Sequence, residues 1–363
     1  MMPNSLLFIP DISGFTKFIQ TTEVEHSQHV IAELLEVLIE ANTEELRLAE
    51  IEGDALFFYK EGEVLSQERL LAQMETMFTA FHSHLKMLEK NRICPCNACS
   101  SAPDLQLKIV AHCGELQYIE VQGRRKPFGQ QVIEAHRLLK NSIDSENYVL
   151  VSQKLAAMIE LPADYVSKVY QFNEGTDHYD GNEVGYMYAI INNDKLSLNT
   201  VPKGHKVQFN KSPNLVLEEH IKIPAALLLE YVSNYGYRHL WVKGVDEFIY
   251  SDNEVTRLGS AHLCVINGKH LNFVAVTKDT EPGQYIYGEM TTSIPIMDEA
   301  YQFYIITPTS EKGCRLQIEN YWMAKSPFKK LFIFLFAKKL FRKNTEEAIK
   351  GLAKFAVNNP VIQ

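Results

Sequence analysis

The stretch that decides the fold at the start of the chain is Leu6-Leu7-Phe8-Ile9-Pro10-Asp11-Ile12-Ser13-Gly14-Phe15-Thr16. Its apolar run is too short for a helix and predicts a buried strand. Asp11 then stands at the end of that strand, where loops carry chemistry on a rigid support. Gly14 permits a tight turn in which backbone amides can approach an anion closely. We therefore expect a strand, a functional carboxylate and a following helix.

A second stretch, Ala49-Glu50-Ile51-Glu52-Gly53-Asp54-Ala55-Leu56-Phe57-Phe58-Tyr59, predicts a hairpin around a Glu-Gly-Asp turn. It places Asp54, a second carboxylate, beside an apolar strand. Two carboxylates on adjacent strand ends suit Mg²⁺, which takes a few carboxylates and completes its shell with substrate phosphates. The two stretches together predict a metal-binding pair, Asp11 and Asp54.

A third stretch, Gly129-Gln130-Gln131-Val132-Ile133-Glu134-Ala135-His136-Arg137-Leu138, completes a pattern. The three stretches resemble the two metal motifs and the Gly-x-x-Val-Asn-x-Ala-x-Arg helix of class III adenylate and guanylate cyclases. This resemblance implies an α+β fold, a ferredoxin-like nucleotide-cyclase sandwich with helices outside a sheet, over residues 1–192. It also implies a purine nucleoside triphosphate as ligand and a homodimer, because class III sites form between two such domains.

The resemblance assigns roles to particular residues. A two-metal site for Mg²⁺ or Mn²⁺ falls on Asp11, Asp54 and Ile12, and a phosphate-binding turn falls on Gly14, Phe15 and Thr16. Metals at such a site would activate the ribose hydroxyl and neutralise charge that develops on the phosphate.

Three further positions concern the nucleotide. Glu50 occupies the base-selecting position, where the resemblance implies guanine, and Lys126 occupies the second base-reading position, where neither nucleotide class has lysine. Arg137 matches the arginine that neutralises the α-phosphate, a contact suited to a planar guanidinium. These residues predict a preference for GTP over ATP.

Two departures from the family pattern bear on catalysis. Ile133 replaces the transition-state asparagine and offers no side-chain hydrogen bond. The later phosphate-binding lysine is missing near residues 172–176. Losing one such donor typically removes two to three orders of magnitude in rate, about 3–4 kcal/mol. Two hypotheses stay open: a cyclase with weak or no turnover, and a non-enzymatic sensor whose cyclase-like domain serves for dimerisation or nucleotide binding.

The second half of the chain follows a polar, proline-bearing linker at 193–213. Before the linker, residues 165–172 are a further strand candidate of the first half. Residues 214–363 predict a strand, a helix over 225–232, several antiparallel strands that include 255–265, and a long C-terminal helix over 326–355. With Arg238-His239-Leu240-Trp241 as a landmark, this order resembles the START-like (polyketide-cyclase-like) helix-grip family. The resemblance implies an antiparallel sheet wrapped on the last helix and a cavity for an apolar small molecule or lipid.

A cluster of cysteines interrupts the first half. Cys94, Cys96 and Cys99 lie within six residues, and Cys96 and Cys99 have the Cys-x₂-Cys spacing of structural zinc sites. Such a site needs a fourth ligand, for which Cys113, His82 and His84 are candidates. The alternative is a reduced thiol cluster without metal.

Composition narrows the class of protein. The 363 residues, 46% hydrophobic and 22% charged, are enough for two globular domains. A net charge of −9 argues against nucleic acid as a partner, and no apolar run reaches the length of a membrane span. Six cysteines without a visible leader indicate reduced or metal-bound thiols, so we expect a cytoplasmic signalling protein.

Overall fold

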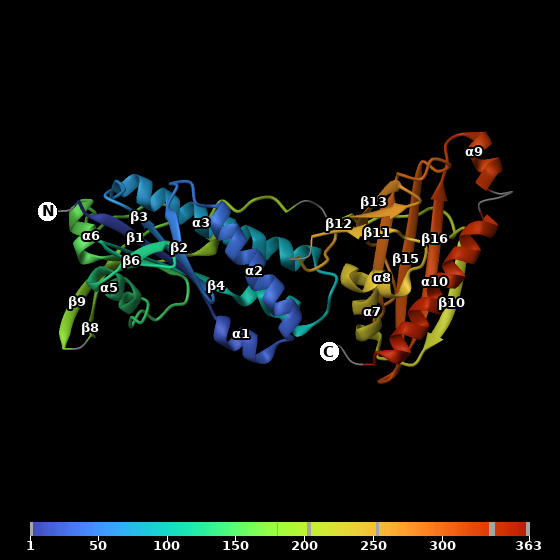
Figure 1. Ribbon diagram of the computed structural model, residues 1–363, viewed down its shortest axis with the longest axis horizontal. Coiled ribbons are helices and arrows are strands. Elements are labelled where there is room, and N and C mark those ends of the chain that lie inside the picture. The colour runs from blue at the N-terminus through green and yellow to red at the C-terminus, as the bar shows by residue number, and fades with distance from the viewer. Residues whose placement is uncertain (1–2, 180, 202–204, 252–253, 334–337, 361–363) are drawn as a thin grey trace. The chain divides into compact units, whose positions relative to one another are not determined.

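The computed structural model describes residues 3–179, 181–201, 205–251, 254–333 and 338–360 (Figure 1). The chain forms two compact units, one of Met1–Met87 with Ser101–Val201 and one of Leu88–Ser100 with Pro202–Gln363. In the described ranges, no helix has the length and apolar character needed to cross a membrane.

The first unit contains a seven-stranded sheet with the order β2-β3-β1-β4-β7-β9-β8. Neighbouring strands are antiparallel except for β4 and β7, which are parallel. Its strands are β1 (Ser5–Ser13), β2 (Arg47–Glu52), β3 (Ala55–Lys60), β4 (Gln106–Gly114), β7 (Tyr148–Ser152), β8 (Asn173–Tyr179) and β9 (Asn182–Ile190). Its helices are α1 (Phe15–Thr21), α2 (Val24–Glu40), α3 (Gln67–Asn91), α5 (Gln130–Leu138) and α6 (Gln153–Met158). Residues 88–91 of α3 belong to the second unit, as does α4 (Asn97–Ser101) except for Ser101.

Strand β1 lies in the middle of this sheet, between β3 and β4. Four consecutive side chains, Leu6 to Ile9, are fully buried, so both faces of the strand are covered. A continuous apolar run is what a strand buried on both faces requires. The strand predicted from this run is therefore confirmed, and so is the hairpin β2–β3, whose turn has Gly53 at φ 71°.

The basic composition of residues 122–128 predicts a loop, and this prediction is wrong in part. Residues Arg124–Phe128 form β6, which pairs with β5 (Gln117–Val121) as a separate two-stranded hairpin. The turn consists of Gln122 at φ 51° and Gly123 at φ 73°. Two consecutive positive φ angles are typical of the type I′ turn that joins tight hairpins.

The second unit contains a fully antiparallel seven-stranded sheet with the order β10-β16-β15-β14-β13-β12-β11 (Figure 1). Its strands are β10 (Leu215–Ile221), β11 (Glu247–Ile249), β12 (Ala261–Ile266), β13 (Lys269–Val276), β14 (Tyr285–Thr291), β15 (Glu299–Ser310) and β16 (Gly313–Met323). Its helices are α7 (Ala225–Ser233), α8 (Arg238–Trp241), α9 (Pro327–Phe332) and α10 (Lys338–Asn358).

Helix α10 lies against β10, α7 and α8 of this unit. Its buried side chains are Thr345, Ile349, Leu352 and Ala356, which recur at helical spacing and form one stripe. The predicted long C-terminal helix corresponds to α9 and α10, and its residues 334–337 lie outside the described part of the chain. An antiparallel sheet with a long last helix is present, while the START-like assignment stays a prediction.

Two strand predictions need correction. Residues 165–172 form no strand but a loop closed by an isolated bridge between Val166 and Gln171. The segment predicted at 255–265 becomes a strand only at Ala261, because Gly259 at φ 91° forms a turn first. Local composition favours strands at both places, but the turns there interrupt the pairing.

Candidate functional site

Asp11 lies near the end of β1, and its two strand neighbours define its surroundings. Ala55 on β3 and Lys108 on β4 are its cross-strand partners. The ammonium nitrogen of Lys108 lies 3.5 Å from a carboxylate oxygen of Asp11, and both side chains are mostly buried. Burial raises the pKa of Asp11, while the nearby charge of Lys108 opposes the shift.

Asp54 lies beside Asp11 because the β2–β3 turn ends next to β1. The backbone amide of Ile12 donates a 3.0 Å hydrogen bond to the carbonyl oxygen of Asp54. Burial and the negative charge of Asp11 together raise the pKa of Asp54 to about 6. The structure therefore brings the two sequence-predicted carboxylates close enough to interact electrostatically.

The turn after β1 carries the remaining residues of the first motif. Gly14 adopts φ 87° and precedes α1, a conformation that side chains with a Cβ rarely take. Ile12 is fully buried, so only its backbone can reach a ligand. Phe15 is half-buried and Thr16 is exposed.

The two candidate base-reading residues contact each other. The ammonium of Lys126 on β6 lies 2.9 Å from a carboxylate oxygen of Glu50 on β2, and about half of each side chain is exposed. An exposed pair of this kind contributes only about 0–1 kcal/mol. Glu50 and Lys126 thus form a weak ion pair that a ligand could separate.

Helix α5 carries the third motif. On this helix, the imidazole of His136 lies 2.9 Å from a carboxylate oxygen of Glu52 on β2. Arg137 is half-buried, and Ile133 is 52% exposed. The helix starts at Gly129, which has φ 105°.

The cysteine loop precedes α4. The sulfur atoms of Cys94, Cys96 and Cys99 all lie within 4.8 Å of one another. The fourth-ligand candidates from the sequence are engaged elsewhere. His82 lies 3.1 Å from the amide oxygen of Asn147, His84 lies 2.9 Å from a carboxylate oxygen of Glu33, and the thiol of Cys113 is 3.9 Å from the sulfur of Met158.

Sequence reasoning missed one residue of the carboxylate site. The sequence could have indicated a role for Lys108. A lysine between the buried residues Leu107 and Ile109 is unusual and implies a charged partner.

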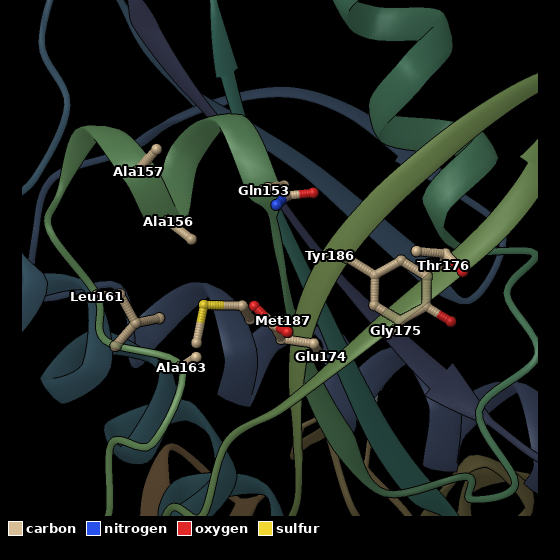
Figure 2. Close-up of a pocket in the computed structure, with 10 residues that line it drawn as sticks. All are labelled: Gln153, Ala156, Ala157, Leu161, Ala163, Glu174, Gly175, Thr176, Tyr186 and Met187. Carbon is tan, nitrogen blue, oxygen red and sulfur yellow. The ribbon is translucent and has the colours of Figure 1, made fainter.

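A separate pocket of about 260 Å³ lies between α6, β8 and β9 (Figure 2). In it the ring of Tyr186 covers Gly175, where an added Cβ would come within 2.5 Å of the ring. None of the site residues predicted from sequence lines this pocket. Its lining residues are Gln153, Ala156, Ala157, Leu161, Ala163, Glu174, Gly175, Thr176, Tyr186 and Met187.

The first unit therefore presents two coupled carboxylates with a lysine, an exposed Glu–Lys pair and an arginine-bearing helix, on the strands and turns predicted to carry them. Carboxylates commonly bind divalent cations, and guanidinium groups commonly bind phosphates.

Comparison with known proteins gives related chains. A family model described as "Protein of unknown function (DUF2652)" matches residues 31–148. Uncharacterized protein Rv2561/Rv2562 of Mycobacterium tuberculosis is 32% identical over 133 residues, which cover 36% of this chain and 60% of that protein. The chain thus spans less than two thirds of the length of this curated relative.

Solved structures similar to this chain include two nucleotide cyclases. The adenylyl cyclase CyaB from P. aeruginosa is 16% identical with a TM-score of 0.40, covering 53% of this chain and 97% of that one. The catalytic core of a rhodopsin-guanylyl cyclase with converted specificity, in complex with ATPalphaS, is 12% identical with a TM-score of 0.40, covering 52% and 97%.

Proposed function

We propose that the first unit binds a purine nucleoside triphosphate together with Mg²⁺ or Mn²⁺, and converts it to a cyclic nucleotide slowly or not at all. The observation that carries this proposal is the pairing of Asp11 and Asp54 on adjacent strand ends. Each carboxylate disfavours ionisation of the other, and a divalent cation between them would remove that penalty. Burial and then the charge of Asp11 raise the pKa of Asp54, as expected if the two carboxylates repel each other.

The site leaves room for ligand oxygens. Asp11 and Asp54 supply two carboxylates. Among the described residues, no group of three or more closely spaced His, Cys, Asp or Glu ligands includes either of them. Mg²⁺ commonly uses one or two carboxylates, with phosphates and water filling its other positions. The metal would then bind with the triphosphate rather than in a closed protein cage.

Base preference rests on Glu50. Its carboxylate can accept hydrogen bonds from the two N–H groups on the edge of guanine, and adenine offers a different edge. Because the contact with Lys126 is exposed and weak, guanine can replace that lysine as partner. We expect GTP to bind more tightly than ATP.

A homodimer fits the surface of this unit. Large apolar side chains are exposed on β2, on the β5–β6 hairpin and on α5, and these elements also carry Glu50, Lys126 and Arg137. Exposed apolar groups of this kind mark interaction sites. They are Leu48, Ile51, Ile119, Val121, Phe128 and Ile133. In the proposed dimer, Arg137 of one protomer approaches the nucleotide held by Asp11 and Asp54 of the other.

A second candidate is a non-enzymatic, nucleotide-free sensor. Lys108 favours it, since its ammonium already supplies a positive charge 3.5 Å from Asp11 and can replace a metal there. For the second unit we propose binding of an apolar small molecule or lipid, on the START-like resemblance of its sequence. Uptake of fluorescent lipids by the full chain tests that part.

Thermal unfolding of the full chain with GTP or ATP, in Mg²⁺ or Mn²⁺, separates the two candidates for the first unit. A ligand at 100 times its dissociation constant stabilises by about 2.7 kcal/mol, and Asp11→Ala should abolish that gain. No shift with either nucleotide, or equal shifts for the wild type and Asp11→Ala, would favour the sensor without nucleotide.

A further inference from the structure

We propose that a basic and apolar surface on α9 and the start of α10 docks on an anionic lipid bilayer. This surface consists of Phe328, Leu331, Phe332 and Leu340, with the exposed lysines Lys330, Lys338 and Lys339. It lies wholly within the second unit, so the inference depends neither on nucleotide binding by the first unit nor on a ligand inside the second.

Helix α9 presents one apolar face to solvent. Phe328, Leu331 and Phe332 stand at positions i, i+3 and i+4 of this helix, so they form a single stripe. Their exposed fractions are 83%, 57% and 45%. Single exposed apolar residues are ordinary on a protein surface, but a group of large ones on one helix face marks an interaction site.

The opposite face of α9 holds the helix on the second unit. The ammonium of Lys329 lies 2.6 Å from a carboxylate oxygen of Asp298, and Ile333, directly after the helix, is buried in a cluster that includes Trp322. Phe341 of α10 packs against the same cluster, with its ring centroid 5.1 Å from that of Trp322. Turning the apolar stripe inward would break the ion pair and expose Ile333, so these contacts keep the stripe directed outward.

The charge around this stripe is positive. The sequence of residues 325–343 contains seven lysines and arginines and no aspartate or glutamate, whereas the whole chain has a net charge of −9. At the start of α10, Leu340 is 58% exposed and directly follows the exposed Lys339. Positive charge concentrated in one short segment of an acidic chain complements the negative headgroups of anionic lipids.

A bilayer surface accommodates both kinds of side chain. Phenylalanine and leucine enter the boundary between headgroups and acyl chains, while lysine keeps its ammonium at the level of the phosphates. Leu331 and Leu340 would gain little from a nucleic acid, whose affinity comes from phosphate contacts and base stacking. The six residues of α9 extend about 9 Å, far less than the hydrocarbon core of about 30 Å, so the helix would lie on the bilayer.

The test is co-sedimentation of the full chain with vesicles of phosphatidylcholine alone, or of phosphatidylcholine and phosphatidylglycerol in equal parts. We expect binding to the anionic vesicles, and binding at least about tenfold weaker to neutral vesicles or in about 0.5 M NaCl. Lys330→Glu/Lys339→Glu should weaken binding at least about tenfold, since each lysine near an anionic surface contributes about fivefold. Phe328→Ser/Leu331→Ser should also weaken it, although the charge is unchanged.

Matched controls come from exposed positions elsewhere in the second unit. Lys269→Glu/Lys312→Glu changes the charge of the chain by the same amount, and Ile249→Ser removes an apolar side chain that is 46% exposed. Both should bind anionic vesicles like the wild type. Equal losses in the controls would overturn the proposal, because net charge alone would then explain the binding.

A second measurement covers variants that fail to fold. Phe328→Trp keeps a large aromatic side chain at the exposed position, and its added fluorescence should shift to shorter wavelength with anionic vesicles and be quenched by brominated lipids. The same substitution at Ile249 should show neither change, which also separates docking from uptake of a lipid into the interior of the unit. No sedimentation of the wild type with anionic vesicles would overturn the proposal. A lipid-free dimer that Phe328→Ser/Leu331→Ser dissociates would overturn it too, and would assign the surface to a second copy of the chain.

Discussion

The ammonium of Lys108 lies 3.5 Å from a carboxylate oxygen of Asp11, directly across the β1–β4 pairing. One lysine therefore offsets part of the charge of two neighbouring carboxylates, Asp11 and Asp54. Lys108 and a divalent cation would neutralise the same carboxylates. Competition between them therefore determines whether the site can take up a metal–nucleotide complex.

Replacing Lys108 by methionine should destabilise the metal-free protein by about 1–3 kcal/mol, since it leaves a mostly buried carboxylate without its cation. In the proposed site, Mg²⁺ with GTP should stabilise Lys108→Met more than it stabilises the wild type. Chemical denaturation with and without the ligand measures both effects. Lys126→Met is the control, as its exposed pair with Glu50 should cost less than about 1 kcal/mol. Equal ligand effects in the wild type and Lys108→Met would contradict the competition.

Asp54 should make the stability of the first unit depend on pH. Its pKa is about 6 in the folded protein and near 3.9 when unfolded, so the folded state binds the proton more tightly. The stability that this proton provides is complete below about pH 4 and is lost as the pH rises through 6. Asp54→Asn should therefore stabilise the metal-free protein at pH 7, by about 1 kcal/mol once solvent screening at this half-buried position is included.

Denaturation curves between pH 4 and 7, without divalent cations, check this dependence. The difference between the wild type and Asp54→Asn should grow as the pH rises through 6. A difference that stays constant, or shrinks, would show that Asp54 ionises at its ordinary pKa.

Ile133→Asn should increase cyclic nucleotide formation. The asparagine would restore a hydrogen-bonding group at an exposed position of α5, and one such donor is worth about two to three orders of magnitude in rate. We expect a rise of at least about tenfold with GTP and Mn²⁺, measured as cyclic product over time. Ile133→Leu should stay at the wild-type rate, and a matching rise there would rule out the hydrogen bond as the cause.

In the second unit, Arg238→Met should destabilise the fold by about 3–5 kcal/mol, because Arg238 and Glu289 form an ion pair that is almost fully buried. The phenol of Tyr287 also donates a 2.8 Å hydrogen bond to Glu289. The double variant Arg238→Met/Glu289→Gln should recover much of the loss, since no buried charge remains. Additive losses in denaturation experiments would show that the two side chains are not coupled.

Features that depend on a few neighbouring residues could be predicted from the sequence. The apolar run before Asp11 and the turn at Gly53 predict a strand and a hairpin, and both are present. The β5–β6 hairpin was missed because Arg124, Arg125 and Lys126 read as a solvated loop. In the structure Arg125 forms an ion pair with Glu61, and Lys126 forms one with Glu50, so these charges have partners outside the hairpin.

Residues that depend on distant pairing could not be predicted in this way. Lys108 reaches Asp11 only because β4 pairs with β1, and no local pattern specifies that register. The spacing of Cys96 and Cys99, by contrast, is a local pattern that by itself indicates a metal ligand pair. Sequence thus indicated which residue types carry chemistry, and the topology shows which of them meet.

The most direct test of the central claim is a calorimetric titration of GTP into the full chain, in Mn²⁺ and again in EDTA, for the wild type and Asp54→Asn. The account predicts saturable binding by the wild type in Mn²⁺, and none in EDTA or with Asp54→Asn. Binding that persists in EDTA, or that is equal in the two proteins, would contradict a metal–nucleotide site at Asp11 and Asp54.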